Sequence, residues 1–530
     1  MIRKVWSFLY GINGIILILY TFFVIGTYIV TSKYDLSIKY TIRWLFISVV
    51  ALVFICPYIL KRLNRFSLSH NENVINSHES SRYFLLFFAI ALSVFLIYWA
   101  GYYPGGFYGD QMGQYGEAMN NHYNDWFPVF HTWLVFKLPL LLTFGWTGSI
   151  ILFQIIEFGI AIAYASVVLL KNTNKMIAWA FLIFVILNPS TGNTAMQPTK
   201  DATFSIGALL LTAFALQIVC SGKKWLKNNN NLIALIIVLL ITTLVRHNAI
   251  LFTAPYLFAL IFYMSKKRAI ITITSVILIV VLIKGPIYSL VGVEGASKRQ
   301  VESLGLPMTV IGAVVTTDPE SLDDEVLDFA YKVAPKEAWE ENYSFGDFNH
   351  VKWDPRSDTM VIEEYGTSNV LRYMIKAFSA NPRAAIQGLI KLTDPVYTIT
   401  DDYSYYATLG IAENEFGIES TGVEAIRSIN NKYTGVVSMM FPHCFMYIGS
   451  MMLLLLVAIL SKCKLNKLAD WKKILFALPV FAYNFGTMFL LTGASDSSRF
   501  FYYSFITVPI LVIMCFIKTD TCCGKEIVRE

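Results

Sequence analysis

Charged residues are scarce in this sequence. Of its 530 residues, only 15% are Asp, Glu, Lys or Arg, whereas 56% are hydrophobic. In soluble domains about a quarter of all residues are charged, so this composition excludes an ordinary water-soluble protein. Many apolar runs instead reach the roughly 20 residues that an α-helix needs to cross a bilayer. The chain is therefore predicted to be an all-α protein with many transmembrane helices.

Cysteines and common catalytic motifs are scarce as well. None of the seven cysteines lies between residues 291 and 434, which excludes a disulfide framework in that polar segment. The motifs GxxxxGK[ST], HExxH and GxSxG are absent, so an ATP-driven or serine-hydrolase mechanism has no residues to support it. The net charge of +6 says little, because in a membrane protein the placement of charge matters more. No nucleic-acid partner is expected.

The apolar runs divide into twelve predicted transmembrane helices. The fifth, Met176–Leu187, is short unless it extends toward Asn193. The predicted spans are Val5–Val30, Ile42–Leu60, Tyr83–Tyr102, Thr147–Leu170, Met176–Leu187, Ala202–Cys220, Leu232–Val245, Ile250–Met264, Ala269–Leu290, Val437–Ser461, Ile474–Leu491 and Phe501–Ile517.

The basic residues sort to one side of these spans. With the N-terminus in the cytosol, the cytosolic connections carry about 22 Lys and Arg, against about seven in the short outer loops. This bias predicts a multi-pass protein of the cell membrane with both termini cytosolic. The first span follows Arg3 and Lys4 and lacks a small-residue cleavage site, so we expect an uncleaved anchor.

The apolar segment His131–Trp146 is not counted as a span. A crossing there would invert every later loop and put the lysine-rich ones outside. It contains Lys137, and its Trp133 and Trp146 suit a membrane–water boundary. We predict an amphipathic helix on the outer interface, within an outer loop of residues 103–146 that holds two short helices.

One segment has a different composition. Residues 291–434 hold 23 Asp and Glu against 12 Lys and Arg, and they follow the ninth span. Their mixed polar and apolar stretches predict mainly α-helices. The expected parts are residues 1–80 with two spans and a cytosolic loop, residues 81–290 with the transmembrane core, residues 291–435 as an extracytoplasmic acidic domain, and residues 436–530 with three spans and a cytosolic tail.

Ionisable residues gather at the outer ends of the predicted spans, where charge is costly and is therefore a sign of function. Asp110 follows a Pro-Gly-Gly turn and opens a helix, with Gln114 and Glu117 on the same helical face. Asp110 is the candidate catalytic residue. The candidate substrate-binding residues are Gln114, Glu117, Asp125, His131, Lys200, Asp201, Arg246, His247, Asn248, Asp496 and Arg499.

Each of these residues also has a purely structural interpretation. Asp110 and Asp201 could cap helices, and Arg246 and Arg499 could reach the lipid headgroups. The candidate residues fall in five stretches of the sequence. Separate structural explanations for all five on one side of the membrane are less plausible together than one binding site. In such a site a carboxylate can take a proton from an acceptor hydroxyl or amine, and arginines can grip a phosphate. The pattern favours group transfer from a polyprenyl-phosphate sugar at the outer leaflet.

Several short motifs resemble one family. YPGGFYGDQMGQ, NDWFPVFHT, TKDATFS, RHNAI, SLGLPMTVIGAVV and SSRFFYYSF occur in the order of a bacterial family of the GT-C glycosyltransferase type. The resemblance implies an inverting enzyme that moves a sugar from a polyprenyl-phosphate donor to a cell-envelope acceptor. It further implies that Asp110 is the catalytic carboxylate and Asp201 a second acid of the site. Arg499 and Arg246 would then hold the donor phosphate.

The chain departs from the GT-C pattern at two places. Phe127-Pro128 stands where many relatives have His-Pro-Pro, and Asp201 has no second acid two residues on. A metal-binding acid pair is therefore missing. A divalent cation at Asp201 stays an open alternative, and no other cofactor is implied.

Three other functions suit a polytopic chain. A transporter or flippase of a lipid-linked glycan or small molecule would place polar groups on broken helices near mid-bilayer. Mid-span positions here are almost free of charge, with Lys284 as the nearest exception. A polysaccharide polymerase or ligase would carry its key basic residues inside the large outer domain. A receptor or scaffold would not require polar residues from five segments to meet.

Overall fold

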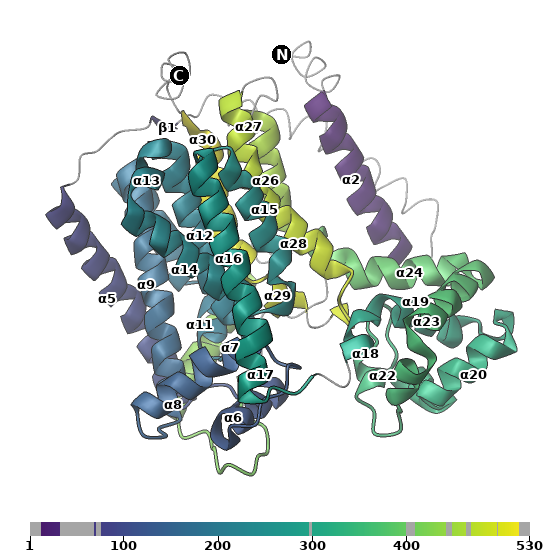
Figure 1. The fold of residues 1–530 in the computed structure, drawn as a ribbon. Helices are drawn as coiled ribbons and strands as arrows, with labels where there is room; N and C mark the ends of the chain where they lie inside the picture. The colour runs from purple at the N-terminus through teal and green to yellow at the C-terminus, as the bar shows by residue number, and fades with distance from the viewer. Residues whose placement is uncertain are drawn as a thin grey trace.

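The computed structural model describes residues 12–31, 68–69, 76–295, 299–398, 409–440, 448–462, 468–494 and 497–518. Within these ranges the chain is almost entirely helical. Its only sheet there is a parallel pair of two-residue strands, β1 (Leu68–Ser69) and β2 (Ile517–Lys518). Figure 1 shows a bundle of long helices with a group of shorter helices beside its lower end. The predicted span Ile42–Leu60 and the candidate residue Asp496 lie outside the described residues.

The bundle holds the apolar helices. They are α2 (Ile12–Thr31), α5 (Ser77–Tyr102), α9 (Gly148–Asn172), α10 (Lys175–Ile186), α11 (Pro189–Ala195), α12 (Lys200–Ser221), α13 (Lys223–Lys227), α14 (Asn229–Leu244), η3 (His247–Ala249), α15 (Ile250–Ile261), α16 (Lys266–Leu282), η4 (Ile283–Ile287), α17 (Tyr288–Val291), α26 (Ile448–Lys462), α27 (Leu468–Leu475), α28 (Leu478–Met488), α29 (Ser497–Phe501) and α30 (Tyr503–Phe516). α12 lies at the centre and packs against α9, α14 and α30.

Several of these helices can cross a membrane. Five are long and apolar enough among the described residues, namely Ser77–Tyr102, Gly148–Asn172, Lys200–Ser221, Lys266–Val291 and Arg499–Phe516. α10 and α11 form a sixth candidate that is bent by 62°, which is either a broken span or a re-entrant loop. α2, α14, α15 and α26 are shorter apolar helices. The chain is thus a helical protein suited to a membrane, and the count of twelve spans stays a prediction.

Small residues allow the central helices to approach closely. A Cβ atom on Gly207 of α12 would collide with Thr242 of α14, and one on Gly159 of α9 would lie 3.1 Å from the Phe88 ring of α5. In lipid, helices associate through such close van der Waals packing, because burying apolar surface there gains little. Glycine at these two positions therefore fixes the spacing of the helices that carry the candidate site.

The first loop folds against the lower end of the bundle. It contains α6 (Gly109–Asn120) and a continuous helical stretch made of α7 (Val129–His131), η2 (Thr132–Lys137) and α8 (Leu138–Leu142). Lys137 Nζ donates to the Ala118 carbonyl at 2.8 Å, which ties the stretch to α6. The exposed side chains at its end are nearly all apolar, as an interfacial helix requires: Leu138, Leu141, Leu142, Phe144 and Trp146.

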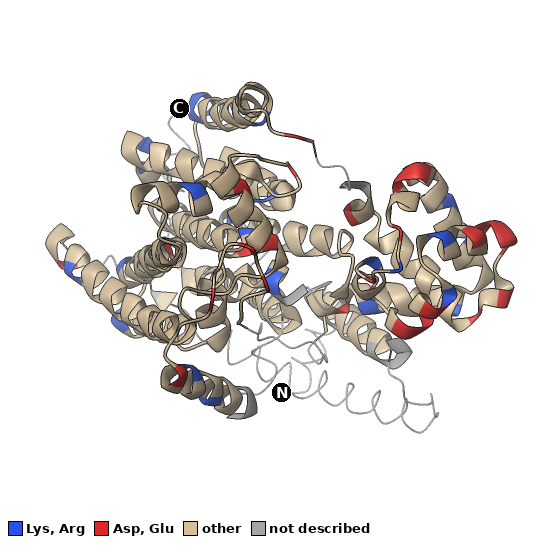
Figure 2. Ribbon diagram, turned by 90° about the horizontal axis from the view of Figure 1, so that it is seen from below, with Lys and Arg blue, Asp and Glu red and all other residues tan. Residues whose placement is uncertain are grey.

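The acidic domain has a hydrophobic core of its own, formed by buried residues between Val301 and Ala385. Leu392 and Val396, near its end, join the core of the bundle instead. Figure 2 shows many Asp and Glu residues spread over the group of helices on the right, with Lys and Arg among them. The helices of the acidic domain are α18 (Arg299–Ser303), α19 (Gly305–Thr317), η5 (Pro319–Ser321), α20 (Asp324–Val333), α21 (Lys336–Asn342), α22 (Asn349–Lys352), α23 (Met360–Ala380), α24 (Pro382–Thr393) and η6 (Asp394–Val396). α25 (Glu424–Met440) instead packs against α5 and α11 of the bundle.

Trp339 is the largest fully buried side chain of the acidic domain, and its indole N–H donates to the Ala330 carbonyl at 2.9 Å. We predict that Trp339→Ala destabilises the domain by about 3–5 kcal/mol, because it removes apolar contacts and leaves a cavity. Trp353→Ala is the control, since Trp353 is 69% exposed. Chemical denaturation followed by tryptophan fluorescence compares the two, and equal losses would contradict the assignment of the core.

Candidate functional site

Asp110 is positioned by a tight turn that precedes α6. Gly105 has φ +142° and faces Ile151 so closely that a side chain would collide. The Gly106 N–H donates to the Met196 carbonyl at 2.8 Å. The N-terminus of α6 is capped by Tyr108 and Gln111, since the Tyr108 N–H donates to Gln111 Oε1 at 3.0 Å. Asp110 is therefore free of a capping role.

Two cations face the Asp110 carboxylate. Its Oδ2 lies 3.5 Å from Lys200 Nζ and 3.6 Å from a guanidinium nitrogen of Arg499. The side chains of Asp110, Lys200 and Arg499 are 36%, 21% and 33% exposed, respectively. They come from the first turn of α6, the first residue of α12 and the short helix α29, which are distant in sequence. We call Asp110, Lys200 and Arg499 the charged cluster.

Aromatic rings support both cations of the cluster. Lys200 Nζ lies 5.7 Å from the centre of the Phe127 ring, and the Arg499 guanidinium lies 4.9 Å from that of Phe500. A cation over an aromatic face is stabilised by the ring quadrupole. Phe127 therefore contributes to the surroundings of Lys200.

A second, buried ion pair lies behind the cluster. Arg246 pairs directly with Asp201, and their side chains are 7% and 2% exposed. Arg246 Nε also donates to Asn248 Oδ1 at 2.5 Å, and its guanidinium lies 4.5 Å from the centre of the Phe500 ring. Thr199 caps α12 by accepting from the Ala202 N–H, so Asp201 is not a cap either.

The electrostatics of the cluster keep Asp110 ionised. Burial alone would raise the pKa of this carboxyl, but the nearby charges of Lys200 and Arg499 outweigh it and lower the pKa below its usual value. Opposite charges within a few ångströms favour the charged form. Asp110 is therefore a carboxylate whose basicity depends on how closely its two cations stay.

Gln114, Glu117 and His131 form a hydrogen-bond network on α6 and η2. Gln114 Nε2 donates to His131 Nδ1 at 2.9 Å and to Thr132 Oγ1 at 3.0 Å. Thr132 Oγ1 donates to Glu117 Oε2 at 3.2 Å. With Nδ1 accepting, the protonated Nε2 of His131 donates to Thr203 Oγ1 at 3.2 Å. The network thus joins the first loop to α12, and its His131 lies close enough to Lys200 of the charged cluster to be affected by that charge.

Burial sets the protonation of this network. It lowers the pKa of His131 to about 3, so the imidazole is neutral. It raises the pKa of Glu117 to about 7, because its hydrogen bonds from Asn124 and Thr132 only partly offset the desolvation. Glu117 is thus a carboxyl that titrates near neutral pH.

The other candidate residues lie around these groups. The Asp125 N–H donates to the Glu294 carbonyl at 2.9 Å, which links the first loop to the start of the acidic domain. His247 opens η3 between α14 and α15, and Asn248 Nδ2 donates to Thr487 Oγ1 at 2.9 Å. These residues hold the loops at the lower end of the bundle, and none of the contacts described here joins them to Asp110.

The acidic domain reaches the charged cluster through backbone bridges. Phe107 pairs with Ile411 just before α6, and Asp347 pairs with Gly493 shortly before α29. A side chain on Gly493 would collide with the Asp347 carboxylate. Asp347 of the acidic domain therefore lies beside the segment before α29, whereas Ile411, in a segment that packs against the bundle, lies beside the start of α6.

Two charged residues, Lys352 and Glu157, are not singled out by the sequence analysis. Lys352 of the acidic domain, paired with Glu302 at 2.7 Å, also lowers the pKa of Asp110; no pattern in the sequence predicts that long-range approach. Glu157 lies in the middle of α9, so it is a second mid-span charge besides Lys284. An acid inside a long apolar run is a signal that the sequence does carry.

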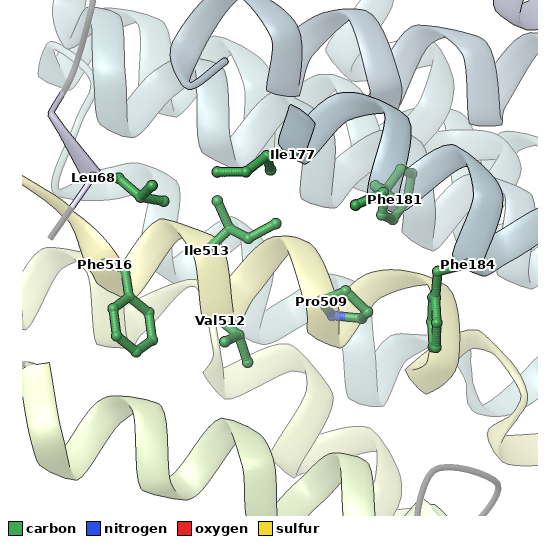
Figure 3. A pocket seen from close by; sticks show the side chains of 9 residues that line it. Leu68, Ile177, Phe181, Phe184, Pro509, Val512, Ile513 and Phe516 are labelled. Carbon is green, nitrogen blue, oxygen red and sulfur yellow. The ribbon is translucent and has the colours of Figure 1, made fainter. Parts of the chain in front are cut away.

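An apolar cavity of about 390 Å³ lies between α10 and α30. Figure 3 shows Ile177, Phe181 and Phe184 on one side of it and Pro509 and Ile513 on the other. No charged side chain contributes to its wall. The cavity is therefore suited to a hydrocarbon chain.

The residues present do not form a metal centre. Among the described parts of the chain, no three His, Cys, Asp or Glu side chains gather in a way that could hold a metal ion. Asp201, the candidate cation ligand, is paired with Arg246, so a cation would have to displace the guanidinium. We derive no step through a cation.

The buried pair supports a stability prediction. Asp201→Asn or Arg246→Met alone should destabilise the protein by about 3–5 kcal/mol, because each leaves one charge buried without its partner. The double variant should recover most of that loss. Thermal unfolding in detergent measures the three variants. Single variants as stable as the unsubstituted protein would contradict the structural role of the pair.

Glu117 supports a pH prediction. Because its pKa is raised from 4.5 to about 7, the folded protein holds a proton that the unfolded chain releases between these values. The free energy of unfolding then falls by at most about 3 kcal/mol as pH rises through this window, and it levels off at higher pH. Glu117→Gln should remove this part of the slope, and Glu364→Gln, at an exposed position, should keep it. Unfolding measured from pH 5 to 8 checks this, and an unchanged slope in Glu117→Gln would refute it.

Comparison of the chain with protein-family models, curated proteins and solved structures gives no match. The resemblance to the GT-C type therefore depends on the sequence motifs alone.

Proposed function

We propose that the chain is a membrane glycosyltransferase of the GT-C type. It moves a sugar, with inversion, from a polyprenyl-phosphate donor to a cell-envelope acceptor at the outer face of the cell membrane. The observation that carries the proposal is the charged cluster, in which a partly exposed carboxylate lies 3.5 and 3.6 Å from two partly exposed cations. The carboxylate is suited to accept a proton, and the two cations are suited to bind a phosphate.

In the proposed reaction Asp110 is the general base. A hydroxyl of the acceptor transfers its proton to the Asp110 carboxylate while its oxygen attacks the anomeric carbon of the sugar. The bond between that carbon and the phosphate oxygen breaks, and its electron pair leaves with the polyprenyl phosphate. The new glycosidic bond is on the opposite face of the sugar ring, and Asp110 is left protonated.

Donor binding would also activate the base. The lowered pKa of Asp110 reflects the charges of Lys200 and Arg499. When a phosphate draws these cations away, the carboxylate regains basicity. In this proposal Lys200 and Arg499 hold the phosphate and its developing charge. Arg246, paired with Asp201, supports Arg499 through the shared Phe500 ring.

The apolar cavity offers a surface for part of the donor's hydrocarbon tail. Four of its lining residues, Pro509, Val512, Ile513 and Phe516, belong to α30, which directly follows the helix that carries Arg499. Their spacing of three and four residues puts them on one helical face. The residues of α30 before Pro509 are buried in the bundle, so in this proposal the cavity would take only a part of the tail that lies away from the phosphate.

The proposal includes the topology predicted by the basic residues. Twelve spans with both termini in the cytosol leave the first loop and residues 291–435 outside. The acidic domain, whose Asp347 pairs with Gly493 shortly before α29, would then meet the acceptor. The lipid-linked donor would enter from the outer leaflet.

Transport of a lipid-linked glycan is the second candidate. The 62° bend between α10 and α11 and the mid-span acid Glu157 are features that transporters use at their binding sites. Loss of glycan movement in Glu157→Gln, with unaffected sugar transfer in Asp110→Asn, would favour transport over transfer.

The transferase proposal predicts distinct kinetic effects. With radiolabelled polyprenyl-phosphate sugars in proteoliposomes, Asp110→Asn should reduce transfer at least about 100-fold through kcat. Arg499→Ala should raise the donor KM by roughly tenfold or more, because it loses a charged phosphate contact. The matched controls are Asp328→Asn and Arg356→Ala, whose side chains are exposed on the acidic domain. Full transfer by a correctly inserted Asp110→Asn protein would rule out the general base.

A further inference from the structure

An exposed apolar stripe runs along the helical hairpin of α23 and α24. Residues 371, 375 and 378 are spaced by four and three, which puts them on one face of α23. Val370, Tyr373 and Ala377 on the opposite face belong to the core of the acidic domain. The stripe consists of Leu371, Ile375 and Phe378 on α23 and Ile386 on α24, with Ile375 60% exposed. Contiguous exposed apolar side chains indicate a binding surface.

The hairpin touches an apolar helix of the bundle. α24 packs against α2, whose 20 residues include no charged side chain. The Tyr20 hydroxyl donates to the Tyr397 carbonyl at 3.2 Å, and the Phe23 and Tyr397 rings are 4.8 Å apart. Figure 1 shows the lower end of α2 directly above α24. The hairpin therefore lies next to the apolar surface of α2, which is suited to contact with the hydrocarbon of lipids.

The charges of the hairpin differ from those of the rest of the domain. Arg372 and Lys376 pair with Glu325 of α20, which neutralises the nearest acids. Arg383, in the first turn of α24, is exposed, and no acid among the described residues pairs with it. The hairpin thus presents an available guanidinium beside its apolar stripe. That combination matches a lipid surface, where apolar side chains insert and a cation meets the phosphates.

We propose that the α23–α24 hairpin docks on the outer leaflet of the bilayer. Leu371, Ile375 and Phe378 insert at the level of the glycerol groups, and Arg383 contacts a lipid phosphate. The contact would fix the height of the acidic domain above the membrane. The inference depends on the chain crossing a membrane and not on the transferase proposal.

The test uses the full chain in lipid nanodiscs, with its native cysteines replaced and one cysteine introduced for an NBD fluorophore. Ile375→Cys and Phe378→Cys report on the stripe, and Asp324→Cys on exposed α20 is the matched control. Lipids with a nitroxide near the headgroup should quench the stripe positions at least about twofold more than the control. Equal quenching at all three positions would overturn the proposal.

Two further measurements separate the remaining outcomes. Arg383→Glu should weaken the quenching at Ile375→Cys more in discs with anionic lipid than in neutral ones, because it reverses the charge near the phosphates. The same effect in both lipids would reject the role of Arg383. If oxidation instead links Ile375→Cys to its counterpart in a second copy, and nitroxide lipids fail to quench it, the surface is a dimer interface and the proposal is wrong.

Discussion

The site depends on a single carboxylate held between two cations. Asp110 stays ionised because Lys200 and Arg499 outweigh the cost of its burial, and the same contacts limit its basicity. An anion that binds the cations would release the carboxylate. In the proposed reaction a phosphate-bearing substrate would therefore raise the basicity of Asp110 as it binds, which an isolated acid at a membrane edge would not allow.

The surrounding structure keeps these three groups together. α12 supplies Lys200 and packs against α30, which follows the helix that carries Arg499. Behind them the Asp201–Arg246 pair shares the Phe500 ring with Arg499. Asp347 of the acidic domain pairs with Gly493 before α29, and Ile411 pairs with Phe107 next to α6. The cluster is thus formed by elements that are distant in sequence, so its geometry depends on how they pack together.

The sequence could predict the helical class and the gathering of charge at one end of the bundle, because charge is rare in such an apolar chain. It could not predict which cation faces Asp110. Lys200 and Asp201 are adjacent, and successive helical residues point about 100° apart, so the rotation of α12 decides that Lys200 faces Asp110 while Asp201 faces Arg246. Lys352 comes near Asp110 only through packing of a distant domain. Glu157 was overlooked because one acid hardly changes the hydropathy of a long window.

The central claim is that the charged cluster binds the phosphate of a lipid carrier. Photocrosslinking with a polyprenyl phosphate that carries a diazirine next to its phosphate, followed by peptide mass spectrometry, tests it most directly. We expect crosslinks in the peptides that contain Asp110, Lys200 and Arg499, and their loss when excess unlabelled polyprenyl phosphate competes. Crosslinks confined to other parts of the bundle, or no competition at these peptides, would contradict the account.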